Sequence, residues 1–313
     1  MTTYRLDPEA TSVSDVLTYE VPPVLTIDPG DTVIVRTLDA RGHLARQAVP
    51  GETRPLLIPD AQGHCLVGPI AIRGATPGQV LAVRFDALRP DDWGYTQAGG
   101  RDDTLNRMVG TAGGDPAFLL WDLDAAAGVG VNQFGLRVPL APFLGVTGLA
   151  PDEPGRHSTI PPRPRGGGNI DCRELTAGST LYLPVTVPDA YLFVGDGHAA
   201  QGDGEVGGTA IECGMTSQLT VTLRAAGAVD SVHAITPAGR ITFGFSDDLN
   251  TATGAALSAI LTWLEALSGQ DRSTVLAVAS VVVDLRITQV ANQTWGAHAV
   301  LPHALTPPEW RES

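Results

Sequence analysis

The sequence contains no lysine, and all 20 of its basic residues are arginines. This absence excludes every mechanism that requires a lysine amine. Pyridoxal phosphate and carbonyl substrates form Schiff bases with lysine, and the phosphate-binding P-loop also requires one. Two widespread hydrolytic triads, Ser-Ser-Lys and Glu-Lys-Cys, are excluded for the same reason. Any nucleophile in this chain must therefore be activated in another way.

Positive charge and cysteine are also scarce. The 34 acidic residues outnumber the arginines and give a formal net charge of -14, so the phosphates of a nucleic acid would be repelled. No apolar run approaches the roughly 20 residues that span a bilayer, and the first residues lack the features of a signal peptide. Three cysteines, an odd number, favour reduced thiols over a disulfide framework. We expect a cytoplasmic protein that binds neither nucleic acid nor membrane.

Runs of β-branched and apolar residues, bounded by glycine and proline, occur through most of the chain. With 36 glycines and 24 prolines in 313 residues, this pattern predicts a protein made mainly of strands. We expect strands within residues 23–37, 66–88, 181–194, 217–224 and 281–290. Residues 91–115 and 150–168 are long and polar, and we predict loops there that act as lids.

One segment near the C-terminus has helical periodicity. Asp247 and Asp248 precede apolar residues spaced by three and four up to Gly269, which predicts a helix, and a second short helix is expected over residues 271–279. The predicted fold class is α+β, predominantly β. An antiparallel β-sandwich-like body is expected over residues 1–235, with a smaller helix-containing α+β subregion over 236–313, packed closely on it or within one single domain.

The segment from Val194 to Glu212, VGDGHAAQGDGEVGGTAIE, combines glycines with groups that bind metals or activate water. It follows an apolar, β-prone run that begins at Leu181, so its polar residues begin where a buried strand ends. Asp-Gly pairs are also ordinary turn residues, which is the alternative interpretation. Polar groups at strand ends more often serve binding and catalysis, and we therefore predict a functional site.

The spacing of the polar residues predicts a metal site. Asp196 and His198 are two apart, so at the end of a strand they point to the same face. Asn169 and Asp171 have the same spacing, and Glu212 is expected at the end of a strand with the sequence TAIE. We predict that Asp171, Asp196, His198 and Glu212 hold a divalent ion; these ligand types favour zinc, with calcium and magnesium as alternatives. For Asp171 the alternative is a turn residue that caps its own backbone.

Catalytic and substrate-binding roles are assigned around this site. Glu205 is predicted to be the general base, and the catalytic group as a whole comprises Glu205, Asp196, His198 and Asp171. The residues predicted to contact the substrate are Asn169, Gln201, Asp203, Trp93 and His64. Cys172 and Cys213 lie beside the cluster and are predicted to be packing residues.

The central block resembles the acetamidase/formamidase family. The resemblance rests on Gly168-Asn169-Ile170-Asp171, on Leu-Pro-Val at 183–185, and on Gly-Asp-x-His-Ala-x-Gln-Gly-Asp-Gly-Glu at 195–205. Weaker similarity at 29–33, 68–78, 93–95 and 284–289 extends it from about residue 25 to about residue 303. Asp189, Gln79 and the Arg- and Pro-rich segment 161–165 depart from the family pattern, which leaves substrate preference open.

The resemblance implies an enzyme that hydrolyses formamide or acetamide to the carboxylate and ammonia, and that assembles as a homo-oligomer. From residue chemistry we expect water activated by the metal ion, with Glu205 accepting its proton. Two other interpretations stay open at this stage. One is a cupin-like metal enzyme, although the His-x-His pair of cupins is missing; the other is a non-catalytic β protein that calcium stabilises or that binds a small ligand.

Overall fold

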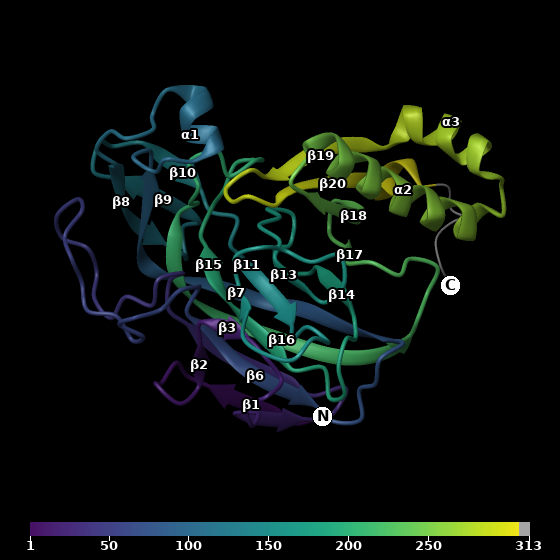
Figure 1. The fold of residues 1–313 in the computed structure, drawn as a ribbon, viewed down its shortest axis with the longest axis horizontal. Helices are drawn as coiled ribbons and strands as arrows, with labels where there is room; N and C mark the ends of the chain where they lie inside the picture. The colour runs from purple at the N-terminus through teal and green to yellow at the C-terminus, as the bar shows by residue number, and fades with distance from the viewer. Residues whose placement is uncertain (307–313) are drawn as a thin grey trace.

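Two long antiparallel strands run through the centre of the protein. The computed structural model describes residues 1–306 (Figure 1). Strand β7 (Gln79–Ala98) pairs with β16 (Glu212–Ala225) along its length, and β5 (Thr32–Thr37) pairs with the other edge of β16. In β16 the buried Leu219 and Val221 alternate with the more exposed Gln218 and Thr220, the period of two that a strand with one buried face requires.

The other strands complete a predominantly antiparallel architecture, in which only the β1–β5 and β4–β6 pairings of named strands are parallel. These strands are β1 (Thr3–Leu6), β2 (Val13–Ser14), β3 (Val16–Leu17), β4 (Leu25–Ile27), β6 (Leu66–Ile72), β8 (Ala117–Asp124), β9 (Val129–Asn132), β10 (Arg137–Pro139), β11 (Phe143–Leu149), β12 (His157–Ser158), β13 (Gly167–Asn169), β14 (Thr180–Pro184), β15 (Leu192–His198), β17 (His233–Ile235), β18 (Gly239–Ser246), β19 (Asp284–Gln289) and β20 (Trp295–Pro302).

The strands β11 and β15 lie in the middle of the main hydrophobic core. All seven residues of each are buried, and the two strands pair antiparallel with each other. Beyond β11, strand β15 also pairs with β6 and, at its C-terminal end, with the start of β16. Polar side chains at the end of β15 are therefore removed from bulk water on both faces of the sheet.

The two longer helices lie beside the C-terminal strands (Figure 1). In α2 (Leu249–Ser268) the Asp248 side chain accepts a hydrogen bond from Thr251 N, and Gly269 ends the helix in the left-handed conformation. Its buried face packs with α3 (Arg272–Val282) and β20 in a second hydrophobic cluster that includes Ile260, Leu264 and Leu301. Both predicted helices are confirmed, and so is the predominantly β, α+β fold class. The division of the chain at residue 235 stays a prediction.

Three local predictions were wrong. Residues 91–98 form the last part of β7 instead of a loop, because they pair with β8, where Tyr95 is opposite Leu120. Within the same predicted loop, residues 104–109 form the short helix α1 (Thr104–Val109), which Asp103 caps. Residues 281–282 belong to α3, so the strand expected from 281 begins at Asp284.

Among residues 1–306, no helix is both long and apolar enough to cross a lipid bilayer.

Candidate functional site

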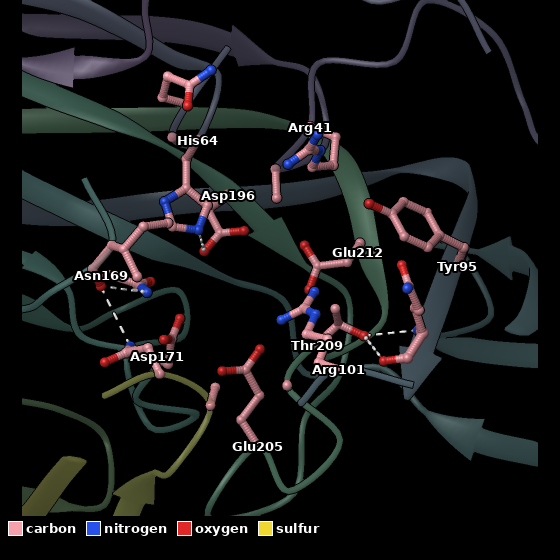
Figure 2. A pocket seen from close by; sticks show the side chains of 18 residues that line it. Arg41, His64, Tyr95, Arg101, Asn169, Asp171, Asp196, Glu205, Thr209 and Glu212 are labelled. Atoms are coloured by element: carbon pink, nitrogen blue, oxygen red, sulfur yellow. Dashed lines mark hydrogen bonds and ion pairs between the residues drawn. The ribbon is translucent and has the colours of Figure 1, made fainter. Parts of the chain in front are cut away.

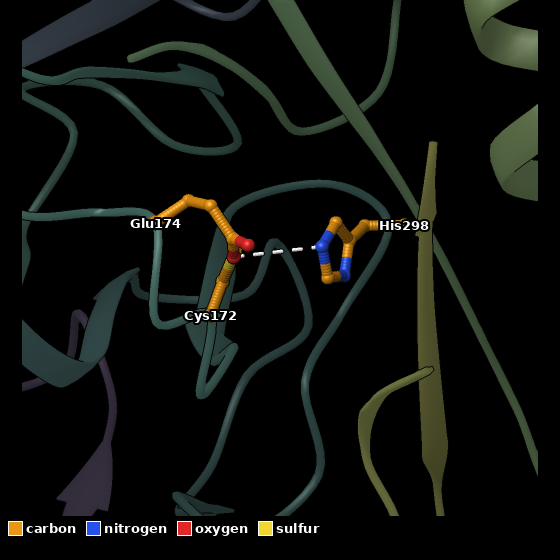
Figure 3. A group of neighbouring side chains, drawn as sticks. All are labelled: Cys172, Glu174 and His298. Carbon is orange, nitrogen blue, oxygen red and sulfur yellow. Dashed lines mark hydrogen bonds and ion pairs between the residues drawn. The ribbon is translucent and has the colours of Figure 1, made fainter. Parts of the chain in front are cut away.

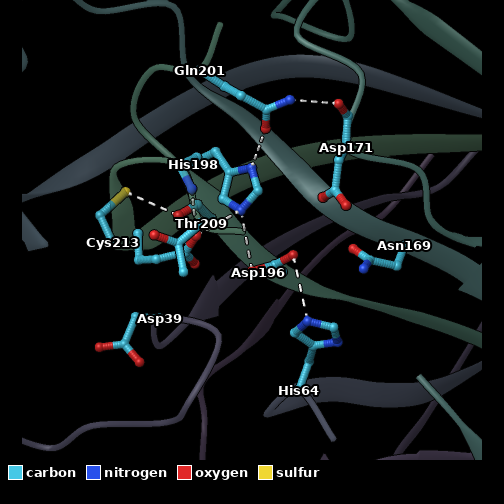
Figure 4. A network of polar contacts seen from close by, with 12 residues as sticks. Asp39, His64, Asn169, Asp171, Asp196, His198, Gln201, Thr209 and Cys213 are labelled. Atoms are coloured by element: carbon cyan, nitrogen blue, oxygen red, sulfur yellow. Dashed lines mark hydrogen bonds and ion pairs between the residues drawn. The ribbon is translucent and has the colours of Figure 1, made fainter. Parts of the chain in front are cut away.

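The pairing of β15 with β16 brings His198 and Glu212 together. The two residues are directly opposite each other, so their side chains project from the same face of the sheet. His198 Nε2 lies 3.2 Å from Glu212 Oε1. The same nitrogen lies 3.3 Å from Asp196 Oδ1 (Figure 4). Glu212 begins β16 instead of ending an earlier strand, a correction to the sequence-based expectation that leaves its side chain at the predicted place.

Asp171 follows the short strand β13, whose pairing with β11 places it in this cluster. Strand β11 pairs with β13 so that Val146 is opposite Asn169. The next two amides, Ile170 N and Asp171 N, donate to Gly145 O at 2.9 and 3.3 Å. A Cβ atom on Gly145 would lie 2.6 Å from Asp171 Oδ1 and closer still to Asp196 Oδ2. The absence of a side chain at Gly145 therefore lets the two carboxylates meet over β11.

Glu205 approaches from the glycine-rich turn. Its backbone closes this turn, because Glu205 N donates to Gly202 O and Gly208 N donates to Glu205 O. Its side chain is buried, and one Glu205 oxygen lies within 4.8 Å of donor atoms of both Asp171 and His198. Asp196, His198 and Glu212 form a second group of donors within the same limit. His198 belongs to both groups, so the structure brings all five side chains into one cluster.

The backbone at three of these carboxylates is strained. Asp171, Asp196 and Glu205 have φ angles of 53°, 59° and 44°, in the left-handed region that residues with a side chain rarely occupy. Such conformations cost of order 1–3 kcal/mol each and persist where the surrounding structure imposes them, which is typical of ligand and active sites. All three strained residues place their carboxylates in the cluster around His198.

Hydrogen bonding fixes the orientation of the His198 ring. Gln201 Nε2 donates to the carbonyl oxygen of Asp171 at 2.7 Å, so Gln201 Oε1 is the atom that faces His198 Nδ1, at 3.0 Å. Because that oxygen can only accept, Nδ1 carries a proton. The lone pair of Nε2 then points at the carboxylates of Asp196 and Glu212. This arrangement is stable only if a proton or a metal ion lies between these groups.

Burial and mutual repulsion shift the pKa values of the acids. Burial, reinforced by the charges of Glu212 and Asp196, raises the pKa of Glu205 to about 8. Burial also raises the pKa of Glu212 to about 7 and that of Asp171 well above its usual range. Burial would lower the pKa of His198, but Glu212 and Asp196 raise it well above its usual value. The cluster therefore contains more acids than its imidazole can neutralise, and in the metal-free protein the raised pKa values mean that some of these acids keep their protons.

Several buried atoms of the cluster have no hydrogen-bond partner in the part of the chain that the structure describes. They are both carboxylate oxygens of Asp171, Oε2 of Glu205, Oε2 of Glu212, Nε2 of His198 and Oδ1 of Asn169. Leaving such atoms unpaired is costly, and native proteins rarely do so without a water or an ion. Carboxylate oxygens and an imidazole nitrogen are ligands that divalent cations accept. These buried groups could therefore hold a metal ion.

A cavity of about 330 Å³ opens onto the cluster (Figure 2). Of the residues predicted from sequence to contact the substrate, His64 and Asn169 line it, and Asn169 Nδ2 donates to Ile160 O at 3.1 Å. His64 Nε2 faces Asp196 Oδ2 at 3.9 Å, and its pKa is lowered by burial.

The other three residues predicted to contact the substrate do not line this cavity. Gln201 lies behind His198 and holds its ring. Trp93 packs against the guanidinium of Arg54, 5.5 Å from the centre of its ring. Asp203 lies 3.8 Å from Arg286. The Gly-Asp-Gly-Glu turn thus separates its two carboxylates, because Glu205 is buried toward the cavity and Asp203 is exposed.

The sequence analysis missed several residues at this site. Arg41, Arg101 and Thr209 line the cavity, and Gly145 lies beneath the cluster. The two arginines lie in loops and belong to no recognisable sequence motif. Gly145 has no side chain, so nothing in its chemistry indicates a functional role. Their places depend on the folding of distant segments onto β15, which no local pattern encodes.

A second polar group joins the segment after Asp171 to the C-terminal strands (Figure 3). The Cys172 thiol donates to Glu174 Oε2 at 3.2 Å, and His298 Nε2 of β20 lies 3.5 Å from the same oxygen. Arg286 of β19 donates to Glu174 Oε1 at 2.6 Å. Burial raises the pKa of Cys172 well above its usual value, so the thiol keeps its proton. This group anchors the segment after Asp171 to β19 and β20.

Comparison with known proteins identifies the family. Residues 7–157 and 153–304 match the model of the acetamidase/formamidase family. The acetamidase structure from Bacillus halodurans superposes with a TM-score of 0.84 at 25% identity, covering 95% of this chain and 97% of that chain. The acetamidase from Yersinia enterocolitica gives 0.82 at 28% identity, covering 97% and 92%.

Curated relatives agree with these structures. The formamidase of Methylophilus methylotrophus is 26% identical over 243 residues, which are 60% of this chain and 58% of the relative. The match thus spans less than two thirds of the length of the curated relatives. The family match itself covers most of the residues from 7 to 304, including β15, the glycine-rich turn and β16. The chain therefore belongs to the acetamidase/formamidase family.

Proposed function

We propose that this chain hydrolyses short aliphatic amides, formamide or acetamide in the first place, to the carboxylate and ammonia. The observation that carries the proposal is the buried cluster of four carboxylates and one imidazole, with unpaired oxygens, at the end of a cavity. Related proteins named formamidase and acetamidase support the reaction class. Amide cleavage needs an activated water, a proton acceptor and a donor to the leaving nitrogen, and the cluster contains groups for each task.

We propose a divalent ion, zinc in the first place, as the cofactor, with Asp171, Asp196, His198 and Glu212 as its ligands. The orientation of His198 supports this assignment, because Gln201 Oε1 faces Nδ1 and Nε2 faces the two carboxylates. An imidazole ligand favours zinc over calcium or magnesium, which prefer oxygen ligands alone. When bound, such an ion supplies a water of lowered pKa and polarises the amide oxygen.

Glu205 is the proposed general base. Its raised pKa, about 8 by burial, gives a carboxylate that can accept a proton from water and return it near neutral pH. It would pass this proton to the amide nitrogen, which leaves as ammonia. Asn169 Oδ1 is a buried acceptor that has no partner among residues 1–306, and it can accept an N–H of the substrate amide. His64, beside Asp196, closes the other side of the cavity.

Ammonia release from formamide and acetamide tests the proposal. We expect turnover by the purified chain, loss of turnover after chelation, and recovery when zinc is added. Turnover that does not change after chelation would support amide hydrolysis and contradict the proposed metal cofactor. Stability that depends on calcium without release of ammonia would instead support the non-catalytic interpretation. A homo-oligomer and a cytoplasmic location stay predictions, for which gel filtration and cell fractionation are the direct tests.

The pKa shifts predict how the metal-free protein responds to pH. In the folded state Glu205 keeps its proton up to about pH 8, whereas the usual value is 4.5, and Glu212 behaves similarly up to about pH 7. Between pH 4.5 and 8 the folded state therefore binds more protons than the unfolded state, and the free energy of unfolding falls as the pH rises. The raised pKa of His198 acts in the same direction, and the lowered pKa of His64 opposes it.

Thermal melting of the chelated protein at pH 5, 6.5 and 8 measures this effect, and we expect the melting temperature to fall across the series. Zinc should reduce the trend, because the ion replaces protons as the counter-charge of the carboxylates. A chelated protein that becomes more stable toward pH 8 would contradict the assigned shifts.

A further inference from the structure

The mouth of the cavity carries positive charge that a neutral amide does not need. Arg41 and Arg101 both line the cavity, and both are largely exposed (Figure 2). Within residues 1–306, neither guanidinium takes part in an ion pair or a hydrogen bond. Elsewhere in the same chain arginines pair with carboxylates, as in Arg73 with Asp28 and Arg286 with Glu174. Acidic residues outnumber basic ones by 34 to 20, so the lack of partners at the mouth does not reflect a shortage of carboxylates.

Both arginines lie close to the proposed catalytic end. Arg101 Nη1 would lie 3.5 Å from a Cβ atom on Gly208, so this guanidinium packs over the turn that carries Glu205. The charge of Arg41 is near enough to His64 to contribute to the lowering of its pKa. The cavity is therefore polarised. Its deep end consists of buried carboxylates and imidazoles, and its mouth presents two guanidiniums.

The size of the cavity also indicates a substrate larger than formamide or acetamide. Its volume of about 330 Å³ is at the lower end of the range of roughly 300–1,000 Å³ that is typical of pockets for drug-sized ligands. Formamide has three heavy atoms and acetamide has four, so either would leave most of this space to water. A longer substrate could place its amide at the cluster and a second group at the mouth. Guanidinium groups recognise carboxylates, with two donors in a planar fork.

We propose that the preferred substrates of this site are amides that carry a carboxylate at the end opposite the amide. This inference rests on the proposed amide hydrolysis. The C–N bond of the amide breaks, a C–O bond to water forms, and the nitrogen leaves as ammonia, which takes up a proton as ammonium. The product is a dicarboxylate. Arg41 and Arg101 bind the carboxylate that does not react, and they offset its repulsion by the acids at the deep end.

Matched pairs of substrates test the proposal. Malonamate, succinamate and glutaramate are compared with propionamide, butyramide and valeramide, and formamide serves as a measure of amidase activity itself. We expect kcat/KM of the zinc-loaded protein to be at least about tenfold higher for one of the anionic amides than for its neutral counterpart. This preference should weaken as the ionic strength rises, because the guanidiniums are exposed and salt screens such charges.

Variants identify the groups responsible. Arg41→Gln and Arg101→Gln, alone and together, should lower the ratio of kcat/KM for the anionic amide to that for the neutral amide by about tenfold. Arg73→Gln, which removes an exposed guanidinium elsewhere on the surface, should leave that ratio as it is. If a variant fails to fold, the salt dependence of the wild-type protein still tests whether exposed charge causes the preference, and the other single variant tests its own arginine.

Three outcomes would overturn the inference in distinguishable ways. Cleavage of formamide without preference for any anionic amide would contradict the proposed class of substrates and still support amide hydrolysis. Arginine variants that lose activity equally toward anionic and neutral amides would place the guanidiniums at the reacting amide instead. Failure to cleave formamide and every other amide would reject the proposed function and this inference together.

Discussion

Replacement of Glu205 by Gln is expected to lower kcat for formamide and acetamide by about 100- to 10,000-fold, the usual contribution of a general base. Gln has the same shape and cannot accept the proton. Burial raises the pKa of Glu205 to about 8 in the metal-free protein, and a bound cation would lower it. The active form is the ionised one, so wild-type activity should rise with pH up to a limit at or below about pH 8. The variant should lose this rise.

Asp203→Asn is the matched control for this experiment. Asp203 stands two residues before Glu205 in the same turn, but it is exposed and lies near Arg286, outside the cavity. The control should keep activity within a few-fold of the wild type. Steady-state kinetics and zinc content of both variants separate a lost base from a lost metal ion. A Glu205→Gln protein with wild-type kcat would exclude Glu205 as the base and leave Asp171, the other buried acid with a raised pKa, as the next candidate.

The chemistry of the cluster could be predicted from sequence because it is concentrated in short segments. Asp196 and His198 end one buried strand, and the spacing of two places them on one face. Glu205 and Glu212 follow within the same glycine-rich segment. Asp171 joins them because Gly145 O binds the amides of residues 170 and 171, a contact that no local pattern shows. Its inclusion in the predicted group followed from its spacing to Asn169.

The features of the fold and the site that the sequence did not predict depend on contacts between segments that are far apart in the chain. The stretch before Ala98 is polar and contains glycine, a composition that predicts a loop, yet β8 supplies hydrogen-bond partners and makes it a strand. In the same way, Arg41 and Arg101 gain significance only when β7, β15 and their connecting loops enclose one cavity. Of the five residues expected to contact the substrate, only His64 and Asn169 line the cavity, because a side chain near the cluster in sequence can point away from it, as Asp203 does.

Replacement of Gly145 by Ala is expected to abolish metal binding and reduce turnover by more than about 100-fold. The added methyl group would lie 2.6 Å from Asp171 Oδ1 and 2.9 Å from His198 Cε1, distances that real Cβ atoms essentially never show. Both side chains are buried, and Gln201 holds the His198 ring and the backbone carbonyl of Asp171, so the side chains cannot move aside without losing their arrangement. Gly145 has no positive φ, and alanine can therefore adopt its backbone conformation. The damage should be confined to the cluster.

Gly254→Ala provides the control, because Gly254 lies within α2, has no positive φ and would place its Cβ atom in open space. Alanine favours helix over glycine by roughly 0.8–1.0 kcal/mol, so this variant should melt at the same or a higher temperature and keep full activity. For Gly145→Ala, circular dichroism should show a retained β fold while zinc analysis shows a metal-poor protein. Normal zinc content and turnover in a folded Gly145→Ala protein would mean that the carboxylates of Asp171 and Asp196 do not need to meet at this point, and the proposed ligand set would have to be abandoned.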